Sequence, residues 1–154
     1  MQIVRANPED ADALTQIAFS AKRHWGYPEH WIQSWRDILT MRREFIAANV
    51  AYCAIEDDSA VGFYVLTAES DGLHLDHLWV MPPAMNRDIG RALFEHAVEQ
   101  AKAAGFHAIK IEADPNAEGF YQQMGARRVG ANITQIEDTR RELPLLVLEL
   151  EGAG

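Results

Sequence analysis

Cysteine is almost absent from this chain of 154 residues, which contains only Cys53. A single thiol cannot form an intrachain disulfide, and the sequence shows no cysteine and histidine cluster at metal-ligand spacing. We therefore expect a protein of the reducing cytoplasm that binds no metal. Because Cys53 lies inside an apolar segment, we expect its thiol to be buried and not to act as a nucleophile.

Long apolar runs are missing as well. No stretch approaches the roughly 20 consecutive apolar residues of a membrane-spanning helix. Residues 1–5 have neither the apolar region of a signal peptide nor the Met-Gly start of a myristoylated chain. Repeats, low-complexity tracts and linkers are also absent. The sequence therefore predicts no membrane partner and a single domain over residues 1–154.

Basic residues are outnumbered by acidic ones, and the formal net charge is 14 − 23 = −9. Binding of nucleic acid requires basic patches, so this balance argues against such a partner. The negative charge suits a cationic acceptor such as an amine, although an acidic surface also serves solubility alone. The apolar content of 48% is that of a folded globular protein.

Hydrophobic periodicity and turn residues predict an α/β chain with a mixed sheet. The expected strands cover residues 2–5, 50–56, 61–69, 73–81, 107–113, 127–133 and 145–150. The expected helices cover residues 7–25, 28–38, 90–104 and 117–124, with a turn or short helical piece at 45–49. The first three strands after the second helix should form an antiparallel meander. The near-continuous apolar run of the next strand is typical of a parallel crossover.

One segment joins a strand to a helix through a short polar loop. It reads Val80-Met81-Pro82-Pro83-Ala84-Met85-Asn86-Arg87-Asp88-Ile89-Gly90-Arg91-Ala92-Leu93. An apolar strand ends at the proline pair, and an amphipathic helix opens at the glycine. Unpaired backbone N–H groups and the positive end of the helix dipole then point at one spot. This arrangement favours a bound phosphate or pyrophosphate.

A second motif follows about 30 residues later. It reads Asp114-Pro115-Asn116-Ala117-Glu118-Gly119-Phe120-Tyr121-Gln122-Gln123-Met124-Gly125-Ala126. Together the two segments resemble the GNAT superfamily of acyl-CoA-dependent N-acyltransferases, and the expected order of elements matches the GNAT fold in outline. The resemblance implies a central mixed sheet of six to seven strands flanked by about four helices. It also implies acetyl-CoA as co-substrate, with no metal.

The loop departs from the family pattern Arg/Gln-x-x-Gly-x-Gly/Ala. Alignment on Gly90 places Met85 at the basic position and Asp88 at the first glycine. A shift of two residues, Arg87-x-x-Gly90-x-Ala92, matches formally but starts the helix too late, so we prefer the first alignment. In it, Asp88 turns outward as a helix cap. The cofactor-binding residues implied here are Arg87, Asp88, Ile89, Gly90 and Arg91, with the two arginines pairing with phosphate. The alternative is an ordinary crossover with a capping aspartate.

The second motif carries the family's tyrosine at Tyr121. The resemblance implies that Tyr121 is the general acid that protonates the departing CoA thiolate, and a phenol with a pKa near ~10 is protonated at neutral pH. Asp114 and Asn116 bracket the position that hydrogen-bonds the pantetheine arm in the family. The alternative is that Phe120 and Tyr121 only pack a short helix.

The strand before the loop carries two histidines and an aspartate within four positions. His74, Asp76, Leu78 and Val80 share one face of a regular strand. The resemblance implies that Leu78, Trp79 and Val80 bind acyl-CoA. It also implies that the N–H of Leu78 or Val80 polarises the acetyl carbonyl, as an oxyanion hole does.

The same resemblance places the general base on this strand. His74 and Asp76 are the candidates, and we favour Asp76 because a carboxylate also attracts a cationic amine. Glu112 on the next strand is a third candidate. Each of these residues has the alternative of surface placement or structural hydrogen bonding.

The joint between the first two helices walls the acceptor pocket in the family. Trp25 and Tyr27 flank a glycine there and would form an aromatic wall that suits an aromatic acceptor or a cation. Packing is the alternative for both, and it is the expectation for Trp31 and Trp35. We expect His96 and His107 to be surface or packing residues.

These observations predict a cytoplasmic N-acetyltransferase that transfers an acetyl group from acetyl-CoA to a primary amine of a small molecule or peptide. The amine would attack the thioester directly in a ternary complex. Two alternatives stay open: a non-catalytic acyl-CoA-binding or regulatory module, and a dimerisation protein that binds no CoA. The final strands suggest a homodimer by resemblance.

Overall fold

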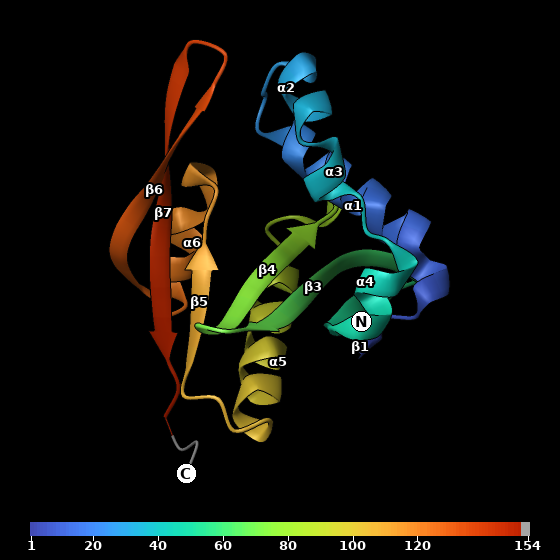
Figure 1. Ribbon diagram of the computed structural model, residues 1–154. Coiled ribbons are helices and arrows are strands. Elements are labelled where there is room, and N and C mark those ends of the chain that lie inside the picture. Colours follow the sequence, from blue (N-terminus) through green and yellow to red (C-terminus); the bar gives the residue numbers. More distant parts are fainter. Residues whose placement is uncertain (152–154) are drawn as a thin grey trace. The chain divides into compact units, whose positions relative to one another are not determined.

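The computed structural model describes residues 1–151, which form seven strands and six α-helices (Figure 1). The strands are β1 (Gln2–Arg5), β2 (Val50–Glu56), β3 (Ser59–Glu69), β4 (Gly72–Val80), β5 (Ala108–Glu112), β6 (Arg127–Ile136) and β7 (Thr139–Glu149). The helices are α1 (Ala11–His24), α2 (Glu29–Ser34), α3 (Arg36–Leu39), α4 (Arg43–Ala48), α5 (Ile89–Ala103) and α6 (Glu118–Gln123). Short 3-10 turns lie at Pro8–Asp10, Pro82–Ala84 and Pro115–Ala117.

The strands form one mixed sheet in the order β1-β2-β3-β4-β5-β7-β6. β1 pairs with β2 and β2 with β3 in antiparallel fashion, and β7 pairs antiparallel with both β5 and β6. β4 and β5 are parallel, with Leu73 opposite Ile109 and His74 opposite Lys110. The expected meander and parallel crossover are therefore confirmed. None of the helices within residues 1–151 is long and apolar enough to span a bilayer.

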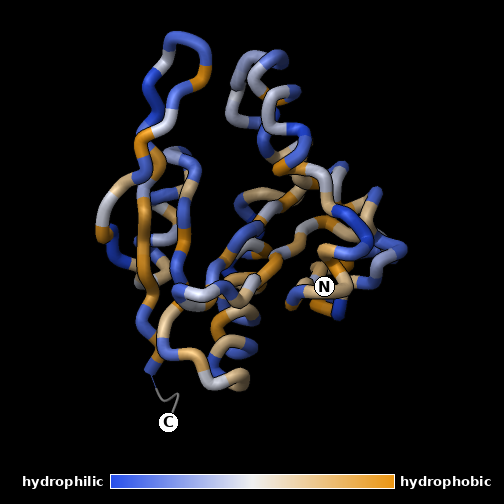
Figure 2. Tube along the Cα trace, in the orientation of Figure 1, coloured by the Kyte–Doolittle hydropathy of each residue, from blue (hydrophilic) through white to orange (hydrophobic). Residues whose placement is uncertain are grey.

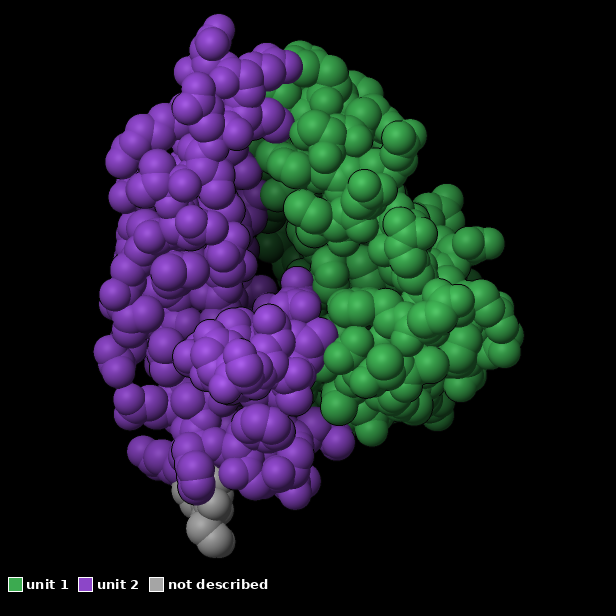
Figure 3. Space-filling model, viewed as in Figure 1, with its two compact units in different colours: residues 1–66, 77–96 green, residues 67–76, 97–154 purple. Residues whose placement is uncertain are grey.

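The chain divides into two compact units (Figure 3). Unit 1 comprises residues 1–66 and 77–96, and unit 2 comprises residues 67–76 and 97–154. Strands β3 and β4 and helix α5 each run from one unit into the other. Each unit is described below by itself.

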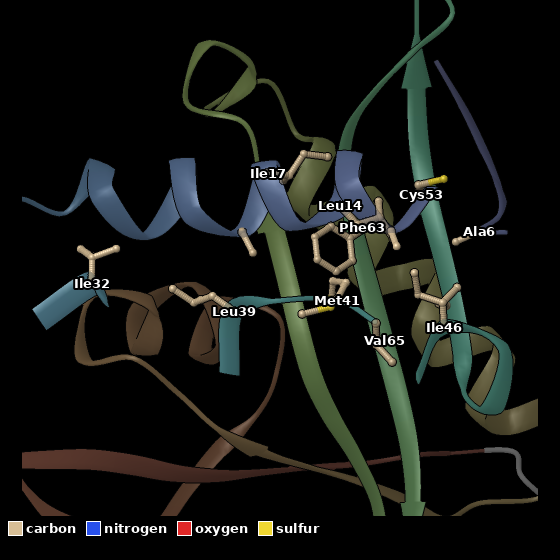
Figure 4. Close-up of a cluster of buried hydrophobic side chains, with 13 residues drawn as sticks. Ala6, Leu14, Ile17, Ile32, Leu39, Met41, Ile46, Cys53, Phe63 and Val65 are labelled. Carbon is tan, nitrogen blue, oxygen red and sulfur yellow. The ribbon is translucent and has the colours of Figure 1, made fainter. Parts of the chain in front are cut away.

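Unit 1 is built around an apolar cluster between α1 and the β2–β3 strands (Figure 4). Leu14, Ile17 and Ala18 lie on one face of α1 at helical spacing, and all three are buried. Phe63 and Val65 meet them from β3, where alternate side chains share a face. The expected amphipathic α1 is confirmed. A 3-10 turn at Pro8–Asp10 precedes it, and the Asp10 carboxylate accepts from the Asn7 N–H at 2.8 Å.

Unit 2 buries apolar side chains of β4, β5, β7 and α6. They include Leu73, Ile109, Ile111, Tyr121 and Leu146. Figure 2 shows a hydrophobic stretch along β7, whereas the turn that joins β6 to β7 is mostly hydrophilic. This contrast follows the sequence, since 143–148 are almost all apolar and 137–142 almost all polar.

The second predicted helix is wrong in its extent. The structure divides it into α2 and α3 at Trp35, where the backbone leaves regular helix geometry. Ile38 is consequently 66% exposed and does not share the buried face of Ile32. Trp31 and Trp35 are half-buried, so they are only partly the core residues that the pattern predicts.

The closing hairpin is longer than predicted at both strands. β7 continues through Pro144, whose position opposite Ala131 requires no proline N–H. The Pro144 carbonyl accepts from the Ala113 N–H at 2.9 Å, so this residue still takes part in the sheet. The other predicted strand and helix boundaries agree with the structure to within about two residues.

Candidate active site

Strand β4 directs two backbone N–H groups away from its neighbour β3. The Met81 N–H donates to the Val61 carbonyl at 2.8 Å, and a Cβ placed on Gly62 would lie 2.9 Å from the Trp79 carbonyl oxygen. Residues 79 and 81 therefore present their backbone groups to β3, and glycine permits the close approach. Because backbone groups alternate along a strand, the N–H groups of Leu78 and Val80 face the opposite edge.

The loop after β4 holds two non-glycine residues in the left-handed region. Asn86 and Asp88 both have φ +63. The Asp88 carbonyl accepts the first α5 hydrogen bond, from the Ala92 N–H at 3.0 Å, so Asp88 occupies the N-cap position. The family pattern that this loop resembles has glycine at this position, which adopts the conformation without strain, and aspartate is one of the few other residues that tolerate it. The Asp88 side chain is exposed.

The remaining loop candidates differ in what their side chains can do. Ile89 is 2% exposed, so only its backbone N–H is available to a ligand. Arg87 is already paired: its Nη2 donates to the two Glu56 carboxylate oxygens at 2.7 and 2.9 Å. Arg91 is exposed and Gly90 is half-buried at the start of α5. A phosphate contact by Arg87 would therefore require it to share or leave Glu56.

Helix α6 places Tyr121 inside unit 2. The side chain is 7% exposed, and burial raises the pKa of its phenol far above the usual value, with a further contribution from the negative charge of Asp114. Tyr121 is therefore a protonated phenol at neutral pH. Phe120 packs against it with an edge-to-face geometry at 5.2 Å between ring centroids.

A short turn before α6 is fixed by Asp114. Its Oδ1 accepts from the Asn116 N–H at 2.8 Å and from Asn116 Nδ2 at 2.9 Å. Its Oδ2 lies 3.8 Å from Arg141 Nη2, and both side chains of this ion pair are nearly buried. Asp114 and Asn116 thus lie together in this turn. Arg141, which sequence reasoning missed, comes from β7 and has no local signal.

The base candidates lie in a polar cluster of unit 2 where β3 ends and β4 begins. His74 Nε2 is 2.7 Å from Asp71, and its Nδ1 is 3.8 Å from Glu69. Lys110 donates to Asp71 at 3.3 Å. Potential ligand atoms of Glu69, His74 and Asp76 all lie within 4.8 Å of one another, close enough to reach one metal ion. Metal-ligand spacing is not visible in the sequence because Glu69 lies on the other side of a turn from His74 and Asp76.

Asp76 has a raised carboxyl pKa. The main cause is the loss of solvation by surrounding protein atoms, although the side chain retains contact with solvent. A hydrogen bond with Thr67 acts in the opposite direction, and the negative charge of Glu69 adds to the rise. Glu112, the third candidate, is exposed and accepts from Asn132 Nδ2 at 3.4 Å.

The aromatic residues of the first joint separate into two groups. Trp25 is 41% exposed and packs against His24. Tyr27 packs against Trp31 at 6.0 Å and Trp35 at 5.1 Å between ring centroids. The Lys22 ammonium lies 4.3 Å from the centre of the Trp35 ring and 5.1 Å from that of Tyr27. Tyr27 and Trp35 also pack against the buried core of unit 1, so the packing alternative for Tyr27 and the expected core role of Trp35 are both supported.

The remaining candidates agree with their predicted structural roles. Cys53 is 2% exposed, and burial raises the pKa of its thiol to about 11, so it is not a nucleophile at neutral pH. His96 Nδ1 is 2.7 Å from the Tyr64 hydroxyl in unit 1. His107 is exposed.

Comparison with known proteins places this geometry in a family. The model of the acetyltransferase (GNAT) domain matches residues 15–137. The chain belongs to the GNAT family. This GNAT chain is 33% identical over 106 residues to the peptidyl-lysine N-acetyltransferase YjaB of Salmonella typhimurium, covering 68% of each protein.

Two solved structures share the fold. One is a GCN5-related N-acetyltransferase from Rhodopseudomonas palustris, with a TM-score of 0.81, 22% identity and coverage of 97% of this chain and 95% of that one. The other is the PaiA N-acetyltransferase from Thermoplasma acidophilum in complex with coenzyme A, with a TM-score of 0.79, 20% identity and coverage of 96% and 98%. The protein is thus an acetyltransferase with the mixed seven-stranded GNAT sheet. The family match favours an enzyme over the two non-catalytic alternatives.

Proposed function

We propose that this GNAT protein transfers the acetyl group of acetyl-CoA to a primary amine, the side chain of a peptide lysine being the first acceptor to test. The observation that carries the proposal is the orientation of β4, whose Leu78 and Val80 N–H groups face away from β3 just before the loop and α5. The names of the curated relatives and the coenzyme A bound in a structural relative support the acceptor and the co-substrate.

The co-substrate's phosphates would be held by the backbone at the start of α5. Asp88 and Ile89 contribute N–H groups there, and the helix dipole adds partial positive charge. The Asp88 carboxylate turns outward, and Arg91 is available for a charge-assisted hydrogen bond. Trp79 and Asn116 would contact the pantetheine arm.

Three groups would carry the reaction. Asp76 takes a proton from the acceptor ammonium, and the neutral amine attacks the thioester carbonyl carbon. The N–H groups of Leu78 and Val80 stabilise the negative charge that develops on the carbonyl oxygen. As the carbon–sulfur bond breaks, Tyr121 gives its proton to the thiolate and regains one from the new amide nitrogen. The net products are the amide, CoA thiol and one proton, and the steps use no metal ion.

An assay of CoA thiol release tests this function. Acetyl-CoA is incubated with a panel of lysine peptides, free amino acids, polyamines and aminated antibiotics, and the acetylated product is identified by mass. We expect thiol release with at least one amine and almost none without. Saturating acetyl-CoA should also raise the melting temperature, because a ligand at 100 times its dissociation constant adds roughly 2.7 kcal/mol. No thermal shift and no binding heat at millimolar acetyl-CoA would contradict the proposal.

Two further expectations remain proposals. We propose one domain over residues 1–154, because β3, β4 and α5 each contribute residues to both units. The homodimer through the final strands is tested by sedimentation velocity, with a monomer as the contrary result.

A further inference from the structure

His77 is a buried histidine in strand β4. It is 9% exposed and lies in unit 1. Its ring meets Phe45 edge-on at 5.9 Å and stacks on Phe63 at 6.3 Å between centroids. Its Nδ1 accepts a hydrogen bond from the indole Nε1–H of Trp79 at 3.0 Å. An apolar side chain would fill this place at lower cost, because a buried polar ring needs a partner.

The hydrogen bond defines the state of the ring. An indole N–H can only donate, so Nδ1 must carry a lone pair and the proton must be on Nε2. The imidazole is therefore neutral. Burial among apolar side chains lowers the pKa of His77 to about 4, which keeps the ring neutral, and the bond intact, throughout the physiological range.

The hydrogen bond between the His77 and Trp79 side chains passes over Leu78, the residue between them in β4. His77 and Trp79 are separated by one residue, so their side chains lie on the same face of β4. Leu78 lies between them with its backbone N–H directed away from β3. A link between alternate side chains limits the local twist of the strand, which sets where the Leu78 and Val80 N–H groups point. Gly62 supports the same geometry by admitting the Trp79 carbonyl.

We propose that His77 is a positioning residue for acyl transfer, which through Trp79 holds the β4 backbone so that the Leu78 and Val80 N–H groups stay aimed at the thioester carbonyl. This inference rests on the proposed function. Oxyanion stabilisation depends on donor geometry, so a small change in strand twist reduces the rate while leaving the binding of the remainder of acetyl-CoA intact.

Two single variants remove the hydrogen bond from opposite ends. His77→Phe removes the acceptor and Trp79→Phe removes the donor, and both keep an aromatic ring. Each should lower kcat about fivefold to tenfold, the scale of one hydrogen bond. His77→Phe, which leaves the proposed CoA-binding residues in place, should change the Kd of acetyl-CoA less than twofold. The double variant should lose no more than either single variant, because both remove one interaction. His77→Asn retains an acceptor near the position of Nδ1 and should recover part of the rate.

A spectroscopic readout separates positioning from packing. The infrared carbonyl stretch of bound, isotope-labelled acetyl-CoA should lie below that of the free compound in the wild type. It should move back toward the free value in His77→Phe and Trp79→Phe. Phe45→Leu is the matched control, because it loosens the same aromatic cluster without touching the hydrogen bond. It should lower the melting temperature and leave the carbonyl stretch and kcat unchanged.

Other outcomes overturn the inference in distinguishable ways. If His77→Phe and Trp79→Phe shift the carbonyl stretch of bound acetyl-CoA by the same amount as the wild type does, His77 is a packing residue only. Multiplicative losses in the double variant would show that His77 and Trp79 act separately. If wild-type protein binds acetyl-CoA without shifting the stretch, the Leu78 and Val80 assignment of the proposed function fails, and this inference fails with it.

Discussion

The two units differ in the chemistry that their residues offer. Unit 1 supplies backbone N–H groups, at Leu78, Val80 and the start of α5, and supports them with buried apolar packing. Unit 2 supplies titratable side chains, of which Tyr121 and Asp76 both have raised pKa values. We therefore expect substitutions in unit 2 to change proton transfer, and substitutions in unit 1 to change stability and the direction of the backbone N–H groups.

The largest expected effect lies in unit 2. Tyr121→Phe keeps the ring and removes the proton donor, so turnover should fall by roughly 10²-fold or more with little change in acetyl-CoA affinity. Pre-steady-state kinetics and calorimetry measure the two quantities. Phe120→Leu is the control, since it alters the neighbouring ring and keeps the hydroxyl. Unchanged turnover, with chemistry rate-limiting, would remove Tyr121 from the mechanism.

In unit 1 the corresponding expectation concerns stability. The folded pKa of His77 is about 4 and that of an unfolded histidine is about 6.5, so between these values only the unfolded chain binds the proton. The free energy of unfolding should therefore fall as pH decreases from 7 to 5. His77→Phe should remove about 2 kcal/mol of this fall, measured by urea denaturation at both pH values.

A packing control accompanies that measurement. Phe45→Leu should destabilise the protein by a similar amount at pH 7 and pH 5, because it removes no titratable group. If His77→Phe showed the same pH dependence as the wild type, the imidazole would not be buried and neutral.

A smaller effect should separate the base from its neighbours in unit 2. Asp76→Asn should lower kcat/KM for the amine roughly tenfold and leave the Kd of acetyl-CoA unchanged. The loss is limited because Glu69 or water can still accept the proton of the amine. Because the base must be ionised, kcat/KM of the wild type should rise with pH around the raised pKa of Asp76, and this rise should be missing from the pH profile of the variant. Asp71→Asn, in the same cluster, should change kcat/KM less than twofold. An unaffected Asp76 variant would direct the search to His74, Glu112 or solvent.

The smallest effect belongs to the unit 1 loop. Asp88→Gly should change the free energy of unfolding by about 1 kcal/mol or less and change acetyl-CoA affinity less than tenfold, because the carboxylate is exposed and glycine accepts φ +63. Asp88→Ala should be less stable than Asp88→Gly by about 1 kcal/mol, since alanine is strained there. Thermal denaturation compares the pair. A tenfold gain in affinity would show that the carboxylate faces the ligand.

Local patterns predicted most of the elements and failed where long-range contacts decide. The boundaries of β2 and α5 follow from apolar spacing and turn residues. The break at Trp35 and the continuation of β7 through Pro144 do not, because both depend on what packs or pairs opposite. The same holds at the site. The two motifs located the Asp88 loop and Tyr121, but the partners Glu56, Glu69 and Arg141 come from distant parts of the chain.

The GNAT resemblance, the order of elements and the residues with suitable chemistry can be read from the sequence, because they depend on local pattern and motif spacing. That His77 is buried and neutral while His74 lies among carboxylates follows only from the folded structure. The two histidines are three residues apart in one strand, and the sequence pattern predicts only that they lie on opposite faces of it. What distinguishes them is desolvation and neighbouring charge, which arise from side chains that folding brings from β3, α4 and the β3–β4 turn.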